Sequence, residues 1–370
     1  LAAHLVGYVN KNGEAMNGLE LSLDELLRGK DGRIKYERDG NRVQLQNGHV
    51  EIDPVVHGKN VQLTIDSDIQ YILEKAIKDT YDRYEPKSIT AIAADPKTMR
   101  ILGMASLPSY NPNEYWKTEP GADFDYAIKG LYEPGSTFKI VTLAAAVEEG
   151  VFNPDETYMS GSIVVSGQPI RDHRREGWGE ITMLEGLKKS SNVAFVKLGY
   201  EKMESATLKR YIDAFGFGQP TGIPLKGEVS GMVAPRYATE WATLTFGQGR
   251  VLVTPIQQVA AVAAIANGGV LMQPQLVDSI EDPNDGSVQK VEPKAVRRVI
   301  SEETARKVGE YLEQVVTDGT GKNAFIEGYR VAGKTGTAQK VVGREYAEGK
   351  YVVSFIGYAP VEDPKIVVYV

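Results

Sequence analysis

One stretch, residues 132–150, constrains the fold of this chain more than any other. Pro134 and Gly135 are unfavourable inside a helix, but the apolar residues after them recur at helical spacing: Ile140, Val141, Leu143, Ala144 and Val147. The pattern predicts a buried helix that begins near Ser136 and ends at the glycine that closes the stretch. A separation of three residues on this helix puts the Lys139 amine beside the Ser136 hydroxyl. A lysine can act as the base for a serine nucleophile when burial or a second cation lowers its pKa.

A Ser-x-x-Lys pair is not specific by itself. A serine that caps a helix, followed by a surface lysine, has the same spacing. Ser287 and Lys290 repeat it in a polar run with no apolar helix behind them. The candidate site therefore depends on partners elsewhere in the chain.

Two further motifs follow the first in the chain. The three motifs are, in order, Ser136-x-x-Lys139, Ser190-x-Asn192 and Lys334-Thr335-Gly336. This ordered set is the signature of penicillin-binding proteins and serine β-lactamases. Ser190 and Asn192 lie where two predicted helices meet, so both side chains can point into a cleft. Gly336 in a predicted strand allows another backbone or a ligand to approach closely. Each motif is weak alone, and the ordered triple is strong.

The first two motifs contain the groups that acyl transfer needs. The reaction requires a nucleophile, a base and a proton path to the leaving group. We expect Ser136 to attack the acyl donor while Lys139 takes its proton. We expect Ser190 to relay a proton toward the leaving amine, and Asn192 to bind a substrate amide.

The third motif provides charge and anion binding. Lys334 is a second cation, which disfavours protonation of the first lysine and attracts a substrate carboxylate. Thr335 and Thr337 can hydrogen-bond that carboxylate, with Gly336 between them. The backbone N–H groups of Ser136 and Thr337 are the expected oxyanion donors.

A loop over residues 171–179 is rich in ligand-binding side chains. It contains three Arg, one His and Trp178. These residues are compatible with a lid or a rim that contacts the ligand, so Trp178 is a candidate substrate-binding residue. A solvated loop anchored by one Trp is the alternative.

The composition excludes several other classes. The net charge of -7 argues against nucleic-acid binding, which needs a basic surface. The chain has no Cys, which excludes thiol catalysis and Cys-based zinc sites, and its four His share no metal-ligand spacing. We therefore expect no metal and no cofactor. No apolar run approaches the roughly 18 to 20 residues of a membrane-spanning helix.

The periodicity predicts strands and helices in one continuous α/β or α+β domain, after a small accessory region. Strands are expected at 61–65, 89–94, 101–105, 163–165, 333–338, 352–358 and 366–370, with a hairpin connection over 340–350. Helices are expected after Asp66 or Ser67, after Thr182, over 193–198, from Thr254 to a stop at Asn267, and after Ser301. The apolar stripe of the first helix is Ile69, Ile72, Leu73, Ala76 and Ile77.

The chain resembles the transpeptidase domain of class B (monofunctional) penicillin-binding proteins, most closely those of Gram-positive division or sporulation. Besides the three motifs, the resemblance includes Gly18-Leu19-Glu20, Asp95-Pro96-Lys97-Thr98, Phe246-Gly247-Gln248-Gly249 and Thr254-Pro255. It implies the fold shared by penicillin-binding proteins and serine β-lactamases, an antiparallel sheet flanked by helices. Residues 59–370 would be the transpeptidase domain, and residues 1–58 the remnant of a non-catalytic pedestal.

The resemblance also implies a function and a location. It implies a D,D-transpeptidase that cross-links peptidoglycan stem peptides ending in D-Ala-D-Ala and is acylated by β-lactams. The partners would be a membrane glycosyltransferase and division or sporulation proteins, at the outer face of the cell membrane. Family members carry an N-terminal membrane anchor and a C-terminal helix; neither is visible in the sequence, so both ends are expected to be cuts.

Four alternatives remain open at the level of sequence. A D,D-carboxypeptidase, a penicillin sensor and a β-lactamase share the three motifs. No Glu-x-x-Leu-Asn segment follows Ser190, which argues against the lactamase with a glutamate-activated water. Residues 328–335 also match the nucleotide-binding pattern G-x-x-x-x-G-K-T, but lack the strand before it and the helix after it.

Overall fold

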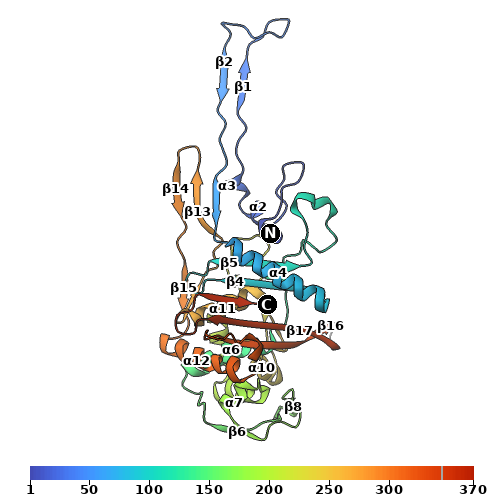
Figure 1. Ribbon diagram of the computed structural model, residues 1–370, viewed down its shortest axis with the longest axis vertical. Coiled ribbons are helices and arrows are strands. Elements are labelled where there is room, and N and C mark those ends of the chain that lie inside the picture. Colours follow the sequence, from blue (N-terminus) through green and yellow to red (C-terminus); the bar gives the residue numbers. More distant parts are fainter. Residues whose placement is uncertain (343–344) are drawn as a thin grey trace.

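The computed structural model describes residues 1–342 and 345–370. At its centre is a five-stranded, fully antiparallel sheet with the order β16-β17-β18-β4-β5 (Figure 1). Its strands are β16 (Ala332–Val342), β17 (Glu345–Ala359), β18 (Ile366–Tyr369), β4 (Ile89–Ala94) and β5 (Ile101–Leu107). The predicted antiparallel sheet is confirmed. The chain leaves the sheet after β5 and returns more than 200 residues later at β16, so the inserted residues can build a second layer beside it.

Helices cover both faces of the sheet (Figure 1). On one face, α4 (Ser67–Tyr84) packs against Ala91, Ala93 and Ala105. The intervening residues Ile92 and Ala94 point to the other face and join the large core. The helices of that core are α6 (Lys139–Glu148), α11 (Pro255–Ala266) and α12 (Glu302–Asp318). This alternation is the period of two that a strand buried on both faces requires.

The long helices begin at the predicted caps. Asp66 accepts hydrogen bonds from two N–H groups at the start of α4, and Ser301 caps α12. Thr254 and Gln257 form a reciprocal capping box at the start of α11, where Pro255 occupies the first helical position. Every residue of α11 is buried, as its apolar sequence predicts.

Two residues of the predicted stripe on α4 are wrong, because Ile72 and Ala76 are both exposed. Ile72 is 62% exposed, while Gln70 is buried in its place. The Gln70 amide exchanges hydrogen bonds with the backbone N–H and C=O of Met104 on β5, at 2.8 and 2.9 Å. A polar side chain is stable at this position because both ends of its amide are paired.

The N-terminal residues divide into a packed part and a projecting part. The short helices α1 (Ala3–Val6), α2 (Gly18–Ser22) and α3 (Asp24–Leu27) come first. Leu5 and Leu19 belong to the large core. The strands β1 (Arg33–Tyr36) and β2 (Val50–Asp53) then form a long hairpin that extends away from the body (Figure 1). Beyond it, β3 (Asn60–Leu63) pairs with β13 (Val277–Asp282), which pairs with β14 (Ser287–Lys290).

Short elements fill the region between the long helices. The helices are α5 (Tyr126–Lys129), α7 (Met183–Lys188), α8 (Asn192–Val196), α9 (Ser205–Ala214) and α10 (Ala238–Leu244), with a π-helical segment at Lys197–Lys202 and 3₁₀ turns at Pro112–Lys117, Gly135–Phe138 and Lys322–Ala324. The strands are β6 (Thr157–Met159), β7 (Ser162–Val165), β8 (Gln168–Arg171), β9 (Glu180–Thr182), β10 (Met232–Val233), β11 (Val251–Leu252), β12 (Val270–Met272) and β15 (Ala295–Arg298).

Two sequence expectations change in the structure. The predicted hairpin connection over residues 340–350 is shorter, because β16 continues to Val342 and β17 starts at Glu345. Residues 343–344, on which part of this prediction falls, lie outside the described residues. Lys334 and Thr335 of the nucleotide-binding pattern lie inside β16, where no helix follows them. Among the helices that the structure describes, none has the length and hydrophobicity to cross a bilayer.

Candidate active site

The turn that carries Ser136 is buried except at the serine itself. The 3₁₀ turn η2 (Gly135–Phe138) runs directly into α6. Within residues 133–146, Ser136 is partly accessible and all the other residues are buried. The helix start predicted near Ser136 is confirmed, and Ser136 is the accessible residue of this segment.

Two glycines allow the Ser136 turn to contact β16. Gly135 has φ +58°, a conformation that suits glycine, and a Cβ there would lie 3.0 Å from Ala338 Cβ and 3.1 Å from Thr337 O. On the strand, a Cβ at Gly336 would lie 2.5 Å from Ser354 Oγ and 2.9 Å from Thr137 Cγ2. The close approach predicted at Gly336 is therefore made by the neighbouring strand β17 and by the turn that carries Ser136.

The amine of Lys139 is buried against the second motif. Its side chain is 0% exposed. The Nζ donates to Ser190 O at 2.7 Å, to Asn192 Oδ1 at 2.9 Å and to Ser190 Oγ at 3.1 Å. It also lies 5.4 Å from the centroid of the Phe195 ring. Ser190 reaches this position with φ +58°, a left-handed conformation that is uncommon outside glycine.

Lys334, on β16, contacts the Ser190 hydroxyl that Lys139 also contacts. Its side chain is also 0% exposed, and its Nζ donates to Ser190 Oγ at 2.9 Å and to Thr335 O at 3.0 Å. Ser190 Oγ is thus within hydrogen-bond distance of both lysine amines. The three motifs, separated by up to 198 residues (334 − 136), meet at this hydroxyl.

Burial controls the charge of the two lysines. Burial first, and the charge of Lys334 second, lower the pKa of Lys139 well below its usual range, while the Asp172 carboxylate opposes this shift. Burial lowers the pKa of Lys334 to about 7. The prediction that Lys334 lowers the pKa of Lys139 is confirmed, although burial is the larger cause. Two ammonium groups that share one hydroxyl repel each other, so the neutral form of one lysine is favoured.

The Asn192 amide is held at both ends. Its Oδ1 accepts from Lys139, and its Nδ2 donates to Arg171 O at 3.0 Å. The side chain remains partly accessible. Arg171 is the last residue of β8, so the end of this strand orients the second motif.

The threonines of the third motif lie on the edge strand of the sheet. Thr337 is exposed and Thr335 is partly buried. Thr335 Oγ1 donates to Thr320 Oγ1 at 3.1 Å. Because β16 pairs with β17 on one side alone among the strands described, its other edge is open to a ligand.

Trp178 contacts His173 and Ser160 rather than the lysine cluster. Its ring contacts His173 edge-on at 5.2 Å, and its backbone N donates to Ser160 Oγ at 2.7 Å. Burial, and then the charge of Lys139, lower the pKa of His173. No contact between Trp178 and either lysine is found among the residues described.

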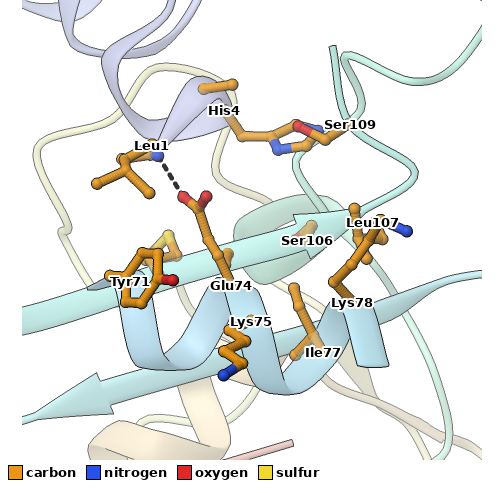
Figure 2. A pocket seen from close by; sticks show the side chains of 14 residues that line it. Leu1, His4, Tyr71, Glu74, Lys75, Ile77, Lys78, Ser106, Leu107 and Ser109 are labelled. Atoms are coloured by element: carbon orange, nitrogen blue, oxygen red, sulfur yellow. Dashed lines mark hydrogen bonds between the residues drawn. The ribbon is translucent and has the colours of Figure 1, made fainter. Parts of the chain in front are cut away.

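A separate pocket of about 360 Å³ lies on the α4 side of the sheet (Figure 2). Glu74 of α4, His4 of α1 and Leu107 of β5 line it, and none of its lining residues belongs to the three motifs. Over residues 1–342 and 345–370, no group of His, Asp and Glu is arranged to hold a metal ion. The lysine cluster is therefore the candidate active site.

The sequence of the site matches a known family. The family described as the penicillin-binding protein transpeptidase domain matches residues 89–370. The chain belongs to this family. The resemblance predicted from the three motifs is confirmed, and with it the penicillin-binding transpeptidase fold.

Known relatives match this transpeptidase domain over the whole length of the chain. Stage V sporulation protein D of Bacillus subtilis is 43% identical over 375 residues, and the peptidoglycan D,D-transpeptidase FtsI of Escherichia coli is 31% identical over 374. Both matches cover 100% of the chain, which spans 58% and 61% of the two relatives' lengths.

The solved structures agree with this assignment of the transpeptidase domain. Penicillin-binding protein 3 of Mycobacterium tuberculosis in its apo form superposes with a TM-score of 0.87 at 32% identity, over 100% of this chain and 81% of that one. The same mycobacterial protein has been solved in complex with ampicillin.

Several residues of the site were not predicted from the sequence. Asp172, Thr320 and Phe195 contact the motifs, and Gly247 supports the Ser136 turn because its carbonyl accepts from Gly135 N at 2.9 Å. Two sequence features pointed toward these residues: Gly247 belongs to a glycine-rich motif of the family, and Asp172 lies in the loop 171–179.

Proposed function

We propose that this chain is a serine D,D-transpeptidase, which cross-links peptidoglycan stem peptides ending in D-Ala-D-Ala through an acyl-serine on Ser136. The observation that carries the proposal is the buried pair of lysine amines that share Ser190 Oγ, together with a partly accessible serine three residues before Lys139. A neutral amine in such a pair can accept a proton at neutral pH, which an exposed lysine cannot.

The proposed acylation step begins at Ser136. Its Oγ attacks the carbonyl carbon of the penultimate D-Ala while its proton passes to the neutral amine of Lys139. The backbone N–H groups of Ser136 and Thr337 stabilise the oxyanion, and the contact of the serine turn with the open edge of β16 favours this arrangement. The D-Ala–D-Ala peptide bond then breaks.

The leaving amine of the terminal D-Ala must gain a proton. Ser190 Oγ accepts a hydrogen bond from Lys334, which leaves its own proton free to point either at Lys139 or at the leaving amine. We assign Ser190 the relay from Lys139 to the leaving group. In the second half of the reaction, an acceptor amine attacks the ester and Ser136 regains its proton.

Substrate recognition is proposed for the groups around the cleft. Thr335 and Thr337, with Gly336 between them and the positive charge of Lys334, would bind the terminal carboxylate of the donor. Asn192 would bind a backbone amide of the donor, and Trp178 would contact the peptide at the rim. No cofactor takes part in this scheme.

The wider setting is also a proposal. β-Lactams would acylate Ser136 because they mimic the D-Ala-D-Ala dipeptide. The protein would act at the outer face of the cell membrane with a membrane glycosyltransferase and with division or sporulation proteins. Residues 59–370 would form the catalytic domain and residues 1–58 the remnant of a pedestal, whose first part packs into the catalytic core through Leu5 and Leu19.

The test is covalent labelling followed by a product assay. A labelled penicillin should form one stable adduct on Ser136, visible by intact mass, and Ser136→Ala should remove the adduct without unfolding the protein. A wild-type protein with no adduct would refute the proposal. Incubation with a D-Ala-D-Ala donor and an amine acceptor then separates the alternatives: cross-linked product supports a transpeptidase, and trimmed donor alone identifies a carboxypeptidase. Rapid turnover of penicillin would identify a β-lactamase.

A further inference from the structure

A buried carboxylate contacts the turn that carries Ser190. Asp172 directly follows β8 and is 2% exposed. Its Oδ1 accepts from Ser191 Oγ at 2.9 Å and from Val193 N at 3.0 Å. Its Oδ2 accepts from Gly161 N at 2.8 Å. A carboxylate that accepts three hydrogen bonds while almost fully buried is strongly bound in one orientation.

These hydrogen bonds connect the carboxylate to the lysine cluster. Ser191 and Val193 lie on either side of Asn192, whose Oδ1 accepts from Lys139 at 2.9 Å. The residue before the carboxylate, Arg171, accepts from Asn192 Nδ2 through its backbone oxygen. Two adjacent residues at the end of β8 therefore hold both the backbone and the side chain of the second motif.

We propose, building on the function proposed above, that Asp172 is a positioning residue for acylation. Its carboxylate holds residues 190–193 so that Ser190 Oγ stays between the amines of Lys139 and Lys334, and it provides the negative charge that faces Lys139. It does not touch the reacting atoms and acts through the second motif and through its charge.

The charge of Asp172 has a consequence that a purely structural carboxylate would lack. The titratable groups that interact electrostatically with Lys139, among the residues described, are Lys334 on β16 and Asp172 and His173 in the loop after β8. Lys334 lowers the pKa of Lys139, and Asp172 raises it. Since Lys139 must be neutral to accept the proton of Ser136, removal of the negative charge should extend acylation to lower pH.

The experiment compares Asp172→Asn and Asp172→Ala with the wild type. The second-order rate of acylation by a fluorescent penicillin is measured from pH 5 to pH 10. In Asp172→Asn, we expect the acidic limb of the profile to move toward lower pH by about one unit. We expect its plateau to fall about ten-fold, because an amide donor replaces the acceptor that faces Gly161 N. Asp172→Ala should show the same direction of shift and a plateau about a hundred-fold below wild type.

The matched control is Asp125→Asn. Asp125 is also buried, at 6% exposed, and caps α5 by accepting from Ala127 N at 3.0 Å, away from the lysines. Its acylation profile should keep the wild-type limb and plateau. Thermal melting of each variant confirms folding. An Asp172→Asn profile whose limb coincides with that of wild type would overturn the proposal.

Failure of this proposal can be distinguished from failure of the proposed function. If the wild type forms no adduct, the function itself is wrong, and the Asp172 proposal falls with it. If the wild type is acylated and the limb does not move, only the role of Asp172 is wrong. If Asp172→Asn does not fold, Ser191→Ala tests the positioning role: it keeps the charge of Asp172 and removes the hydroxyl that donates to the carboxylate and caps α8 by accepting from Ala194 N. It should lower the plateau without moving the limb, and an unchanged plateau would overturn the proposal.

Discussion

The buried charge of Lys334 should destabilise the folded protein at neutral pH, and its replacement by Met should reveal this cost. Lys334 is 0% exposed, and burial lowers its pKa from 10.5 to about 7. Between these two values the unfolded chain binds a proton that the folded chain does not hold. The free energy of unfolding therefore rises with pH across this window. Lys334→Met keeps the apolar stem and removes the titrating group.

The magnitude follows from the pKa difference. The shift of Lys334 from 10.5 to about 7 lowers the free energy of unfolding by about 4 kcal/mol at pH 7, and by only about 1 kcal/mol at pH 10. The Met variant also loses the hydrogen bonds to Ser190 Oγ and Thr335 O, which we take as about 2 kcal/mol together. The variant should thus be more stable than wild type by about 2 kcal/mol at pH 7 and less stable by about 1 kcal/mol at pH 10.

Urea unfolding at both pH values measures this difference. Lys97→Met is the control: Lys97 is half exposed, and its ion pair with Asp363 lies on the surface, so its effect on stability should be small at both pH values. Acylation of Lys334→Met by a labelled penicillin should fall at the same time, since loss of the second charge raises the pKa of Lys139. A stability difference that keeps its sign and size from pH 7 to pH 10 would refute the reasoning.

Three further predictions test other parts of the site. Lys139→Ala should slow acylation by about three orders of magnitude or more, because base and nucleophile act as a unit, and stopped-flow measurement with a labelled penicillin checks this. Gly247→Ala should lower the free energy of unfolding by about 2 kcal/mol or more, because its Cβ would overlap Gly135 O, whereas Gly40→Ala, with open space around it, should have little effect in the same melts. Thr337→Val should weaken binding of a carboxylate-bearing donor about ten-fold, read as a higher KM, and leave the melting temperature unchanged; an unchanged KM would exclude this threonine from carboxylate binding.

The periodic parts of the fold were predictable from sequence. The strands of the central sheet and the helices α4, α11 and α12 were expected at nearly their observed positions, because their apolar periods are strong and their caps are local. The exposed Ile72 of α4 shows the limit of prediction from periodicity. Ile72 fits the helical stripe but is exposed, since Gln70 is paired with the backbone of β5, and this contact depends on a strand far along the chain.

The sequence motifs named the candidate residues of the site but not the charges and burial around them. Hydrogen bonds join Lys139, Ser190, Asn192 and Lys334, and Ser136 lies three residues before Lys139 in the same segment. Nothing in the loop 171–179 identified Asp172 as the buried carboxylate among several charged neighbours. Its burial depends on hydrogen bonds from Gly161, Ser191 and Val193, which local sequence does not reveal.

The sequence by itself determined the family, the order of the elements and the residue types of the site, because these depend on local periodicity and on motifs read along the chain. Only the tertiary structure decided that Lys139 and Lys334 share one hydroxyl, that the Ser136 turn lies against β16 at two glycines, and that a buried carboxylate holds the second motif. The pKa of a lysine is set by its burial and by the charges around it. Those charges come from segments that are distant in the chain and adjacent only after folding.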